Sequence, residues 1–112
     1  MKKVLLINDD PDFQSLIKKY LKRKGFFAET IDMTDDVIPF VEEFKPDVII
    51  VDMKMETDKG ICSQLRQKLK VEAKLILLSD QSVKPTTLDI CKPDVILQKP
   101  FQPEELIEKI AM

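Results

Sequence analysis

The most constraining feature of this sequence is a series of short apolar runs that each end in polar residues. The runs are residues 4–7, 48–51, 74–78 and 95–98, and they are followed by Asn8 to Asp10, Asp52, Ser79 with Asp80, and Lys99. Runs of this length are typical of buried strands, and the stretches between them have a helical period. Strands that alternate with helices predict an α/β fold around a parallel sheet.

Asp52 closes the apolar run of residues 48–51. Because burying a carboxylate costs free energy, we expect this side chain at the edge of the sheet rather than inside the core. In open parallel α/β sheets, ligands bind at the edge formed by the carboxyl ends of the strands. The sequence therefore predicts that carboxylates, a hydroxyl and one ammonium group meet at a single edge.

The stretches between the runs predict amphipathic helices. The first is expected from Pro11 to a glycine cap at Gly25, the second after a cap at Thr34, the third over residues 60–69, and the last from Pro103. The expected buried face of the first helix consists of Phe13, Leu16, Ile17, Tyr20 and Leu21. Prolines suit the first turn of a helix, and glycine suits the left-handed residue that ends one.

Two segments give weaker patterns. Residues 26–31 are a plausible second strand. Residues 81–94 contain two prolines and only a short apolar pattern, so we expect at most a short or irregular helix there.

Composition limits the classes of protein to which the chain could belong. Its 112 residues are enough for one domain with its own core, and the net charge of −2 argues against nucleic acid as a direct ligand. No apolar stretch approaches the roughly 20 residues of a membrane span, and the amino terminus does not resemble a signal peptide, so we expect a cytoplasmic protein. The absence of histidine excludes Ser-His and Cys-His catalysis, and Cys62 and Cys91 are expected to be reduced.

The polar residues at the strand ends suit phosphoryl transfer with Mg²⁺. Mg²⁺ takes one or two carboxylates together with water and phosphate oxygens, and Asp9 and Asp52 could supply them. Asn8 or Asp10 could make an outer-sphere contact. An aspartate can also attack a phosphoryl group. Positive charge from the metal and Lys99, together with the Ser79 hydroxyl, would then stabilise the phosphoryl oxygens.

Each of these signals has an ordinary structural explanation when taken alone. Asp9 and Asp10 could be acids at a helix amino terminus, where the helix dipole favours them. Ser79 with Asp80 could be a turn, and Lys99 with Pro100 is a common loop dipeptide. The functional interpretation depends on all of the strand ends being polar at once.

The chain resembles the receiver domain of bacterial two-component response regulators over its whole length. The resemblance rests on residues 8–13, residues 46–55 followed by Gly60, Ser79, and residues 99–101. It implies a flavodoxin-like, doubly wound five-stranded parallel sheet in the order 2-1-3-4-5, with helices on both faces. Residues 1–112 would form one receiver domain, either alone or as a module of a longer protein.

The resemblance also implies a function. Asp52 would accept a phosphoryl group from a sensor histidine kinase or a phosphotransfer protein, with Mg²⁺ bound by Asp9, Asp52 and the backbone carbonyl of Lys54. Ser79 and Lys99 would bind the phosphoryl group and act as the switch, with a Lys99–Pro100 peptide bond that is often cis. The signal would pass to a downstream protein or a fused output domain, and a homodimer is a candidate assembly. No direct contact with nucleic acid or membrane is expected.

Several residues depart from the family pattern. Asn8 stands at the first position of an acidic pair, Glu56 follows Met55, Asp80 follows the switch hydroxyl, and Ile96 occupies the position of an aromatic switch residue. Glu56, Asp80 and the proline-containing segment 81–94 favour an alternative function, a degenerate receiver that binds a protein partner without phosphorylation. An aspartyl phosphatase is disfavoured, because Lys54 stands where a second acid would be needed, so we do not expect an enzyme.

Overall fold

A parallel β-sheet forms the centre of the computed structural model, which describes residues 2–32, 37–52, 60–69, 73–79 and 92–111. The elements in chain order are β1 (Lys3–Ile7), α1 (Pro11–Arg23), β2 (Phe27–Ile31), α2 (Val37–Phe44), β3 (Val48–Asp52), α4 (Ile61–Gln64), η1 (Leu65–Leu69), β4 (Lys74–Ser79), β5 (Val95–Gln98) and α6 (Pro103–Ala111). Within the described ranges, the five strands lie in the order β2-β1-β3-β4-β5, and all neighbouring strands are parallel. The predicted fold class and strand order are confirmed.

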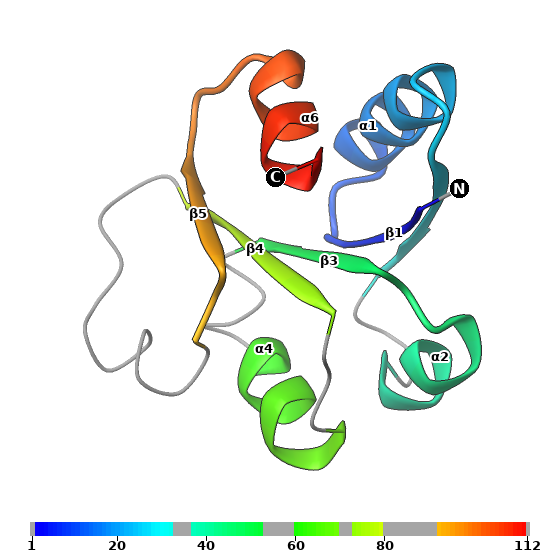
Figure 1. Cartoon of the computed structure of the whole chain (residues 1–112), viewed down its shortest axis with the longest axis vertical. Coiled ribbons are helices and arrows are strands. Elements are labelled where there is room, and N and C mark those ends of the chain that lie inside the picture. The colour runs from blue at the N-terminus through cyan, green and yellow to red at the C-terminus, as the bar shows by residue number, and fades with distance from the viewer. Residues whose placement is uncertain (1, 33–36, 53–59, 70–72, 80–91, 112) are drawn as a thin grey trace.

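Helices cover both faces of the sheet, with α1 and α6 on one face and α2 and α4 on the other (Figure 1). The buried residues divide in the same way, because successive side chains of a strand point to opposite faces. Leu5, Ile49 and Leu75 pack with α2 and α4, whereas Leu6 and Ile50 pack with α1 and α6. The strands are therefore buried on both sides, as their continuous apolar runs predict.

Helix α1 begins and ends at the signals that the sequence contains. The Asp10 carboxylate accepts hydrogen bonds from the backbone amides of Asp12 (3.0 Å) and Phe13 (3.3 Å), which caps the helix. Gly25 follows the helix with φ of 90°, a conformation that glycine adopts without strain. The predicted buried face is wrong at Leu16, whose side chain is 63% exposed. A 13-residue helix on a sheet buries a narrower stripe than the apolar spacing suggests.

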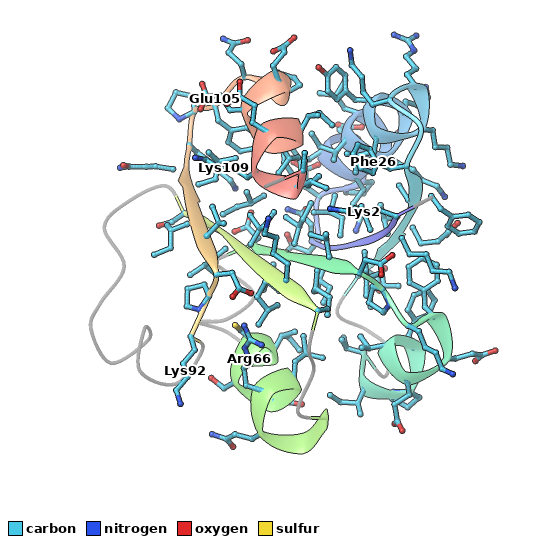
Figure 2. The ribbon with its side chains drawn as sticks, viewed as in Figure 1. Lys2, Phe26, Arg66, Lys92, Glu105 and Lys109 are labelled. Carbon is cyan, nitrogen blue, oxygen red and sulfur yellow. The ribbon has the colours of Figure 1, made fainter. Side chains whose placement is uncertain are left out.

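The predicted helix over residues 60–69 changes geometry partway. Four α-helical residues of α4 are followed by the π-helical turn η1, which contains Arg66. Arg66 extends toward the beginning of β5, where it donates to the Lys92 carbonyl (2.9 Å) and to the Asp94 carboxylate (3.3 Å) (Figure 2). Asp94 also accepts a hydrogen bond from the amide of Leu75 (2.8 Å), so this contact fixes β5 beside β4.

Two further expectations have different outcomes. Cys62 is disulfide-bonded, so the prediction of a reduced thiol is wrong for this residue. Thr34, Cys91 and the segment 80–91, which includes most of the irregular stretch, lie outside the described residues.

None of the helices within the described ranges is long and apolar enough to cross a membrane.

The difference in burial between β4 and β5 leads to a prediction about one isoleucine on each of these strands. Ile76 of β4 is fully buried, whereas Ile96 of β5 is 41% exposed. We expect Ile76→Ala to lower the free energy of unfolding by about 2–5 kcal/mol, because it leaves a cavity in the core. The matched substitution Ile96→Ala is expected to cost under about 1 kcal/mol. Urea unfolding followed by circular dichroism measures both, and equal losses would contradict the described position of β5.

Candidate functional site

Polar residues from the central and edge strands meet at the carboxyl edge of the sheet. Asp52 and Ser79 are the last residues of β3 and β4, and Asn8 and Lys99 directly follow β1 and β5. Among the described residues, the buried polar or charged ones are Asn8 (3% exposed), Asp52 (8%) and Ser79 (1%). All three lie at this edge, so the buried polarity of the domain is concentrated in one place.

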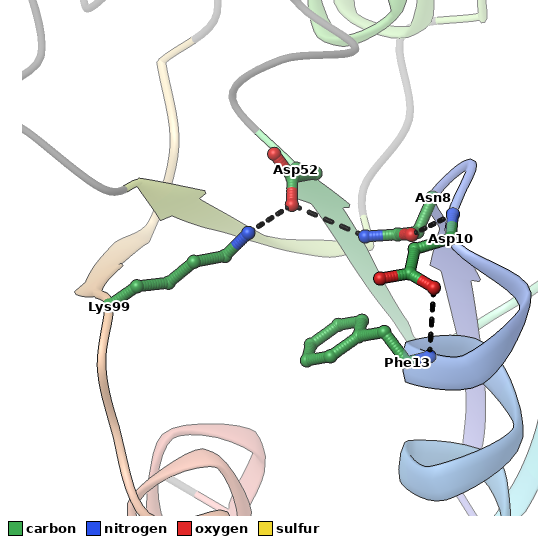
Figure 3. Close-up of polar contacts among 5 residues, drawn as sticks. All are labelled: Asn8, Asp10, Phe13, Asp52 and Lys99. Carbon is green, nitrogen blue, oxygen red and sulfur yellow. Dashed lines mark hydrogen bonds and ion pairs between the residues drawn. The ribbon is translucent and has the colours of Figure 1, made fainter.

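An ion pair between Asp52 and Lys99 is the central contact of the site. The Lys99 ammonium lies 2.5 Å from Asp52 Oδ2, and the carboxylate side chain is only 12% exposed (Figure 3). Lys99 is held at its backbone, because its amide donates to the Ser79 carbonyl (2.7 Å). The peptide bond that follows, to Pro100, is cis. The Lys99 ammonium also lies 5.6 Å from the centre of the Phe13 ring, within range of a cation–π contact.

Asn8 supplies the second hydrogen bond to the same carboxylate oxygen. Its Nδ2 donates to Asp52 Oδ2 at 3.2 Å, and its Oδ1 accepts from the backbone amide of Asp10 at 2.6 Å (Figure 3). The sequence predicts Asn8 only as an outer-sphere metal contact, so its role as a donor to Asp52 was missed. The pairing could not be read from the sequence because it depends on the register between β1 and β3.

Gln14 is a further residue of the site that the sequence patterns did not indicate. Its side-chain amide donates to the Asn8 carbonyl and, at 3.3 Å, to the Ile31 carbonyl at the end of β2. These bonds connect the first turns of α1 with the ends of β1 and β2. Gln14 thereby fixes the backbone that carries Asn8 toward Asp52.

The structure brings together some of the predicted site residues and leaves others apart. Asn8, Asp52 and Lys99 are in direct contact, and Ser79 joins them through its backbone carbonyl. Asp9 is exposed on the loop between β1 and α1. The predicted metal ligand Lys54, together with Glu56 and Asp80, lies outside the described residues. The altered switch position, Ile96, is 41% exposed on the edge strand.

The carboxylates at this edge suit Mg²⁺, because this ion needs few ligands from the protein. Within the described part of the chain, no three Asp, Glu, His or Cys side chains are grouped so as to hold an ion. Mg²⁺ usually takes only one or two carboxylates and completes its shell with waters and phosphate oxygens. The side-chain oxygens of Asn8 and Asp10 already accept backbone hydrogen bonds. Asp52 Oδ2 likewise accepts from Lys99 and Asn8, so the carboxylates of Asp9, Asp10 and Asp52 are the described groups at this edge from which such an ion could take a ligand.

Comparison with known proteins shows to which family the chain is related. A family model of the response regulator receiver domain matches residues 4–111. The alkaline phosphatase synthesis transcriptional regulatory protein PhoP of Bacillus subtilis is 29% identical over 113 residues, which cover 97% of this chain and 47% of that protein. The probable transcriptional regulator ycf27 of Guillardia theta is 28% identical over 111 residues, which cover 96% of this chain and 43% of that protein. The chain spans less than half the length of these two relatives.

Solved structures agree with the sheet order and the helix arrangement. The chemotaxis response regulator CheY4 of Vibrio cholerae superimposes with a TM-score of 0.85 at 22% identity, over 99% of this chain and 97% of that chain. The BeF3-activated receiver domain of Klebsiella pneumoniae RstA gives a TM-score of 0.77 at 18% identity, over 97% and 95% of the two chains. At these identities the structures support the fold, and the family model covers nearly the whole sequence. This chain belongs to the response regulator receiver domain family.

Proposed function

We propose that this chain is a phosphoacceptor signalling domain that receives a phosphoryl group on Asp52. Receiver domains are signalling domains rather than classical enzymes. The observation that carries the proposal is the contact of Asp52, a buried carboxylate at a strand end, with the Lys99 ammonium 2.5 Å away. The donor would be a phosphohistidine of a sensor histidine kinase or a phosphotransfer protein, as expected for the receiver domain family.

The chemical step is a displacement at phosphorus. A carboxylate oxygen of Asp52 forms a bond to phosphorus as the bond from phosphorus to the donor's imidazole nitrogen breaks, and the electron pair leaves with the imidazole. Lys99 then faces phosphoryl oxygens as well as the carboxylate, and its charge stabilises them. The Ser79 side chain, buried at the end of β4, is proposed to donate its hydroxyl hydrogen to one of these oxygens.

A bound Mg²⁺ would neutralise negative charge on the transferring phosphoryl group. We infer that Asp9 and Asp52 hold it, with the Lys54 carbonyl as a further ligand and Asn8 or Asp10 in its outer sphere. The exposed position of Asp9 leaves room for the waters that such an ion keeps.

An apolar hollow beside Lys99 supports docking of the phosphoryl donor at this edge. It measures about 380 Å³ and is lined by side chains of α1 and of the loop after β5, among them Phe13, Leu16, Ile17 and Phe101. A docked helix of the donor protein would cover the exposed Leu16, which the core of this domain does not use. Its phosphohistidine would then be close to Asp52.

Phosphorylation is proposed to change the surface that follows β4 and β5. The Ser79 carbonyl and the Lys99 amide are hydrogen-bonded, so movement of either switch residue is transmitted to the other strand end. Because Ile96 replaces an aromatic residue at the switch position, the change on β5 is expected to be small. The recipient would be a downstream protein or a fused output domain, in the cytoplasm, with a homodimer as one candidate assembly.

Contact of this domain with nucleic acid is not part of the proposal. The relatives named above are described as transcriptional regulators, and each is more than twice as long as the segment that matches this chain. We infer that recognition of DNA, where it occurs, belongs to another domain. A net charge of −2 agrees with that division.

A second candidate is a receiver that binds its partner without being phosphorylated. Asn8 favours it, because it removes one negative charge from the position at which the family pattern has an acid. The exposed Ile96 favours it as well, because an apolar side chain on an edge strand can contact a partner in any phosphorylation state.

Intact mass after incubation with acetyl phosphate and Mg²⁺ separates the two functions. We expect one added phosphoryl group on the natural chain and none on Asp52→Asn, because the amide is not a nucleophile for this reaction. Asp47→Asn is the matched control, since Asp47 is an exposed aspartate just before the same strand, and it should still be phosphorylated. No adduct on the natural chain would favour the phosphorylation-independent module.

Removal of the Lys99 charge tests whether the ion pair holds the site together. Lys99→Met should lower the free energy of unfolding by about 1–3 kcal/mol, because it leaves a buried carboxylate without its cation. Lys18→Met is the control, since Lys18 pairs with Glu29 at 3.5 Å with both side chains about one-third exposed, and it should cost under about 1 kcal/mol. Urea unfolding measures both variants, and equal small losses would show that Asp52 does not depend on Lys99.

A further inference from the structure

The Asn8 side chain lies between a hydrogen-bond donor and a hydrogen-bond acceptor, so its amide can bond to both in only one orientation. Its oxygen faces the Asp10 backbone amide at 2.6 Å, and its nitrogen faces Asp52 Oδ2 at 3.2 Å. Turning the amide over would bring an oxygen against the carboxylate and an NH₂ group against an N–H donor. Asn8 is therefore a donor to Asp52, and it is held in that role by its neighbours.

Two donors from the chain itself meet the Asp52 carboxylate at one oxygen. The same oxygen, Oδ2, accepts from the Lys99 ammonium and from the Asn8 amide, so one negative charge meets one positive charge and one neutral donor. An aspartate at position 8 could still accept from Asp10, but its second oxygen would face Asp52 at about the same distance as the present nitrogen. Two carboxylates at that separation repel each other unless a cation lies between them.

We propose that Asn8 sets the metal requirement of this site. Its amide gives Asp52 a donor where a second carboxylate would need a cation, so the resting site is assembled without Mg²⁺ and binds that ion weakly. The inference rests on the proposed function, which makes Asp52 the acceptor, but it concerns the domain before any phosphoryl group arrives. Metal binding in this chain would then be coupled to the phosphoryl donor, whose oxygens supply the missing ligands.

Contacts from the first turn of α1 fix Asn8 in this position. Gln14 donates to the Asn8 carbonyl, and the carboxylate of Asp10 is engaged in capping the helix. The backbone of Asn8 is also anchored to β2, because its amide donates to the Ile31 carbonyl at 3.2 Å. The hydrogen bonds of its amide and carbonyl hold the backbone of Asn8 in place. Rotating the side chain away from Asp52 would break both side-chain hydrogen bonds.

Thermal melts in EDTA and in millimolar Mg²⁺ test the proposal on unphosphorylated protein. The natural chain should melt at nearly the same temperature in both buffers. Asn8→Asp should melt about 4–8 °C lower in EDTA and recover in Mg²⁺, because the added carboxylate needs a cation. Calorimetric titration should show Mg²⁺ binding at least about tenfold tighter in the variant.

The double variant Asn8→Asp/Asp52→Asn is the matched control, because it exchanges the carboxylate and the amide while keeping one of each. Its melting temperature in EDTA should be close to that of the natural chain. Its affinity for Mg²⁺ should return from that of Asn8→Asp to that of the natural chain. An Asn8→Asp variant whose response to Mg²⁺ equals that of the natural chain would overturn the proposal. If that variant folds in neither buffer, the natural chain decides, and a marked fall in its melting temperature on chelation would overturn the proposal.

Failure of this inference and failure of the proposed function give different results. If Asp52 accepts no phosphoryl group, intact mass shows no adduct while the melts remain as predicted. If Asn8 has no part in metal dependence, the melts of the natural chain and of Asn8→Asp respond alike to Mg²⁺ while the adduct on Asp52 still forms.

Discussion

A buried carboxylate is the constraint on which the rest of this structure depends. Removing the charge of Asp52 from water costs free energy that only nearby donors and positive charge can offset. The parallel sheet supplies them, because the chain emerges from every strand at one edge and brings Asn8 and Lys99 to the same carboxylate oxygen. The strand order decides which residues can reach Asp52 at the end of β3. Strand β1 lies directly beside β3, and β5 is separated from β3 by β4 alone.

Helix α1 links this edge to the surface. Its first turn holds Asn8 through Gln14 and places the Phe13 ring beside Lys99, so the packing of one helix positions two residues that contact Asp52. The same helix exposes Leu16 next to an apolar hollow at the site. A single element thus supports Asp52 from inside and forms part of the apolar surface beside it, where we propose that a donor protein docks. Leu16 is one of three large apolar side chains that are exposed among the described residues, together with Phe27 and Ile96.

Much of the fold was predictable because its signals are local. Apolar runs mark the strands, and the cap at Asp10 and the glycine at position 25 mark the ends of α1. The resemblance to receiver domains supplied the strand order, which composition and periodicity do not determine. The hydrogen bond from Asn8 to Asp52 and the bonds of Gln14 were missed, because they join residues that only the strand register brings together. The exposure of Leu16 was missed because apolar spacing indicates a helical face without giving the width that the sheet covers.

We propose that Asp52 carries a phosphoryl group beside Lys99, and a crystal structure of the protein with Mg²⁺ and beryllofluoride tests this most directly. The RstA receiver has been solved in a BeF3-activated form. We expect beryllium bonded to an Asp52 oxygen, with the Lys99 ammonium within hydrogen-bond distance of a fluoride. An Asp52 side chain that stays paired with Lys99 at saturating beryllofluoride, with no adduct, would contradict it.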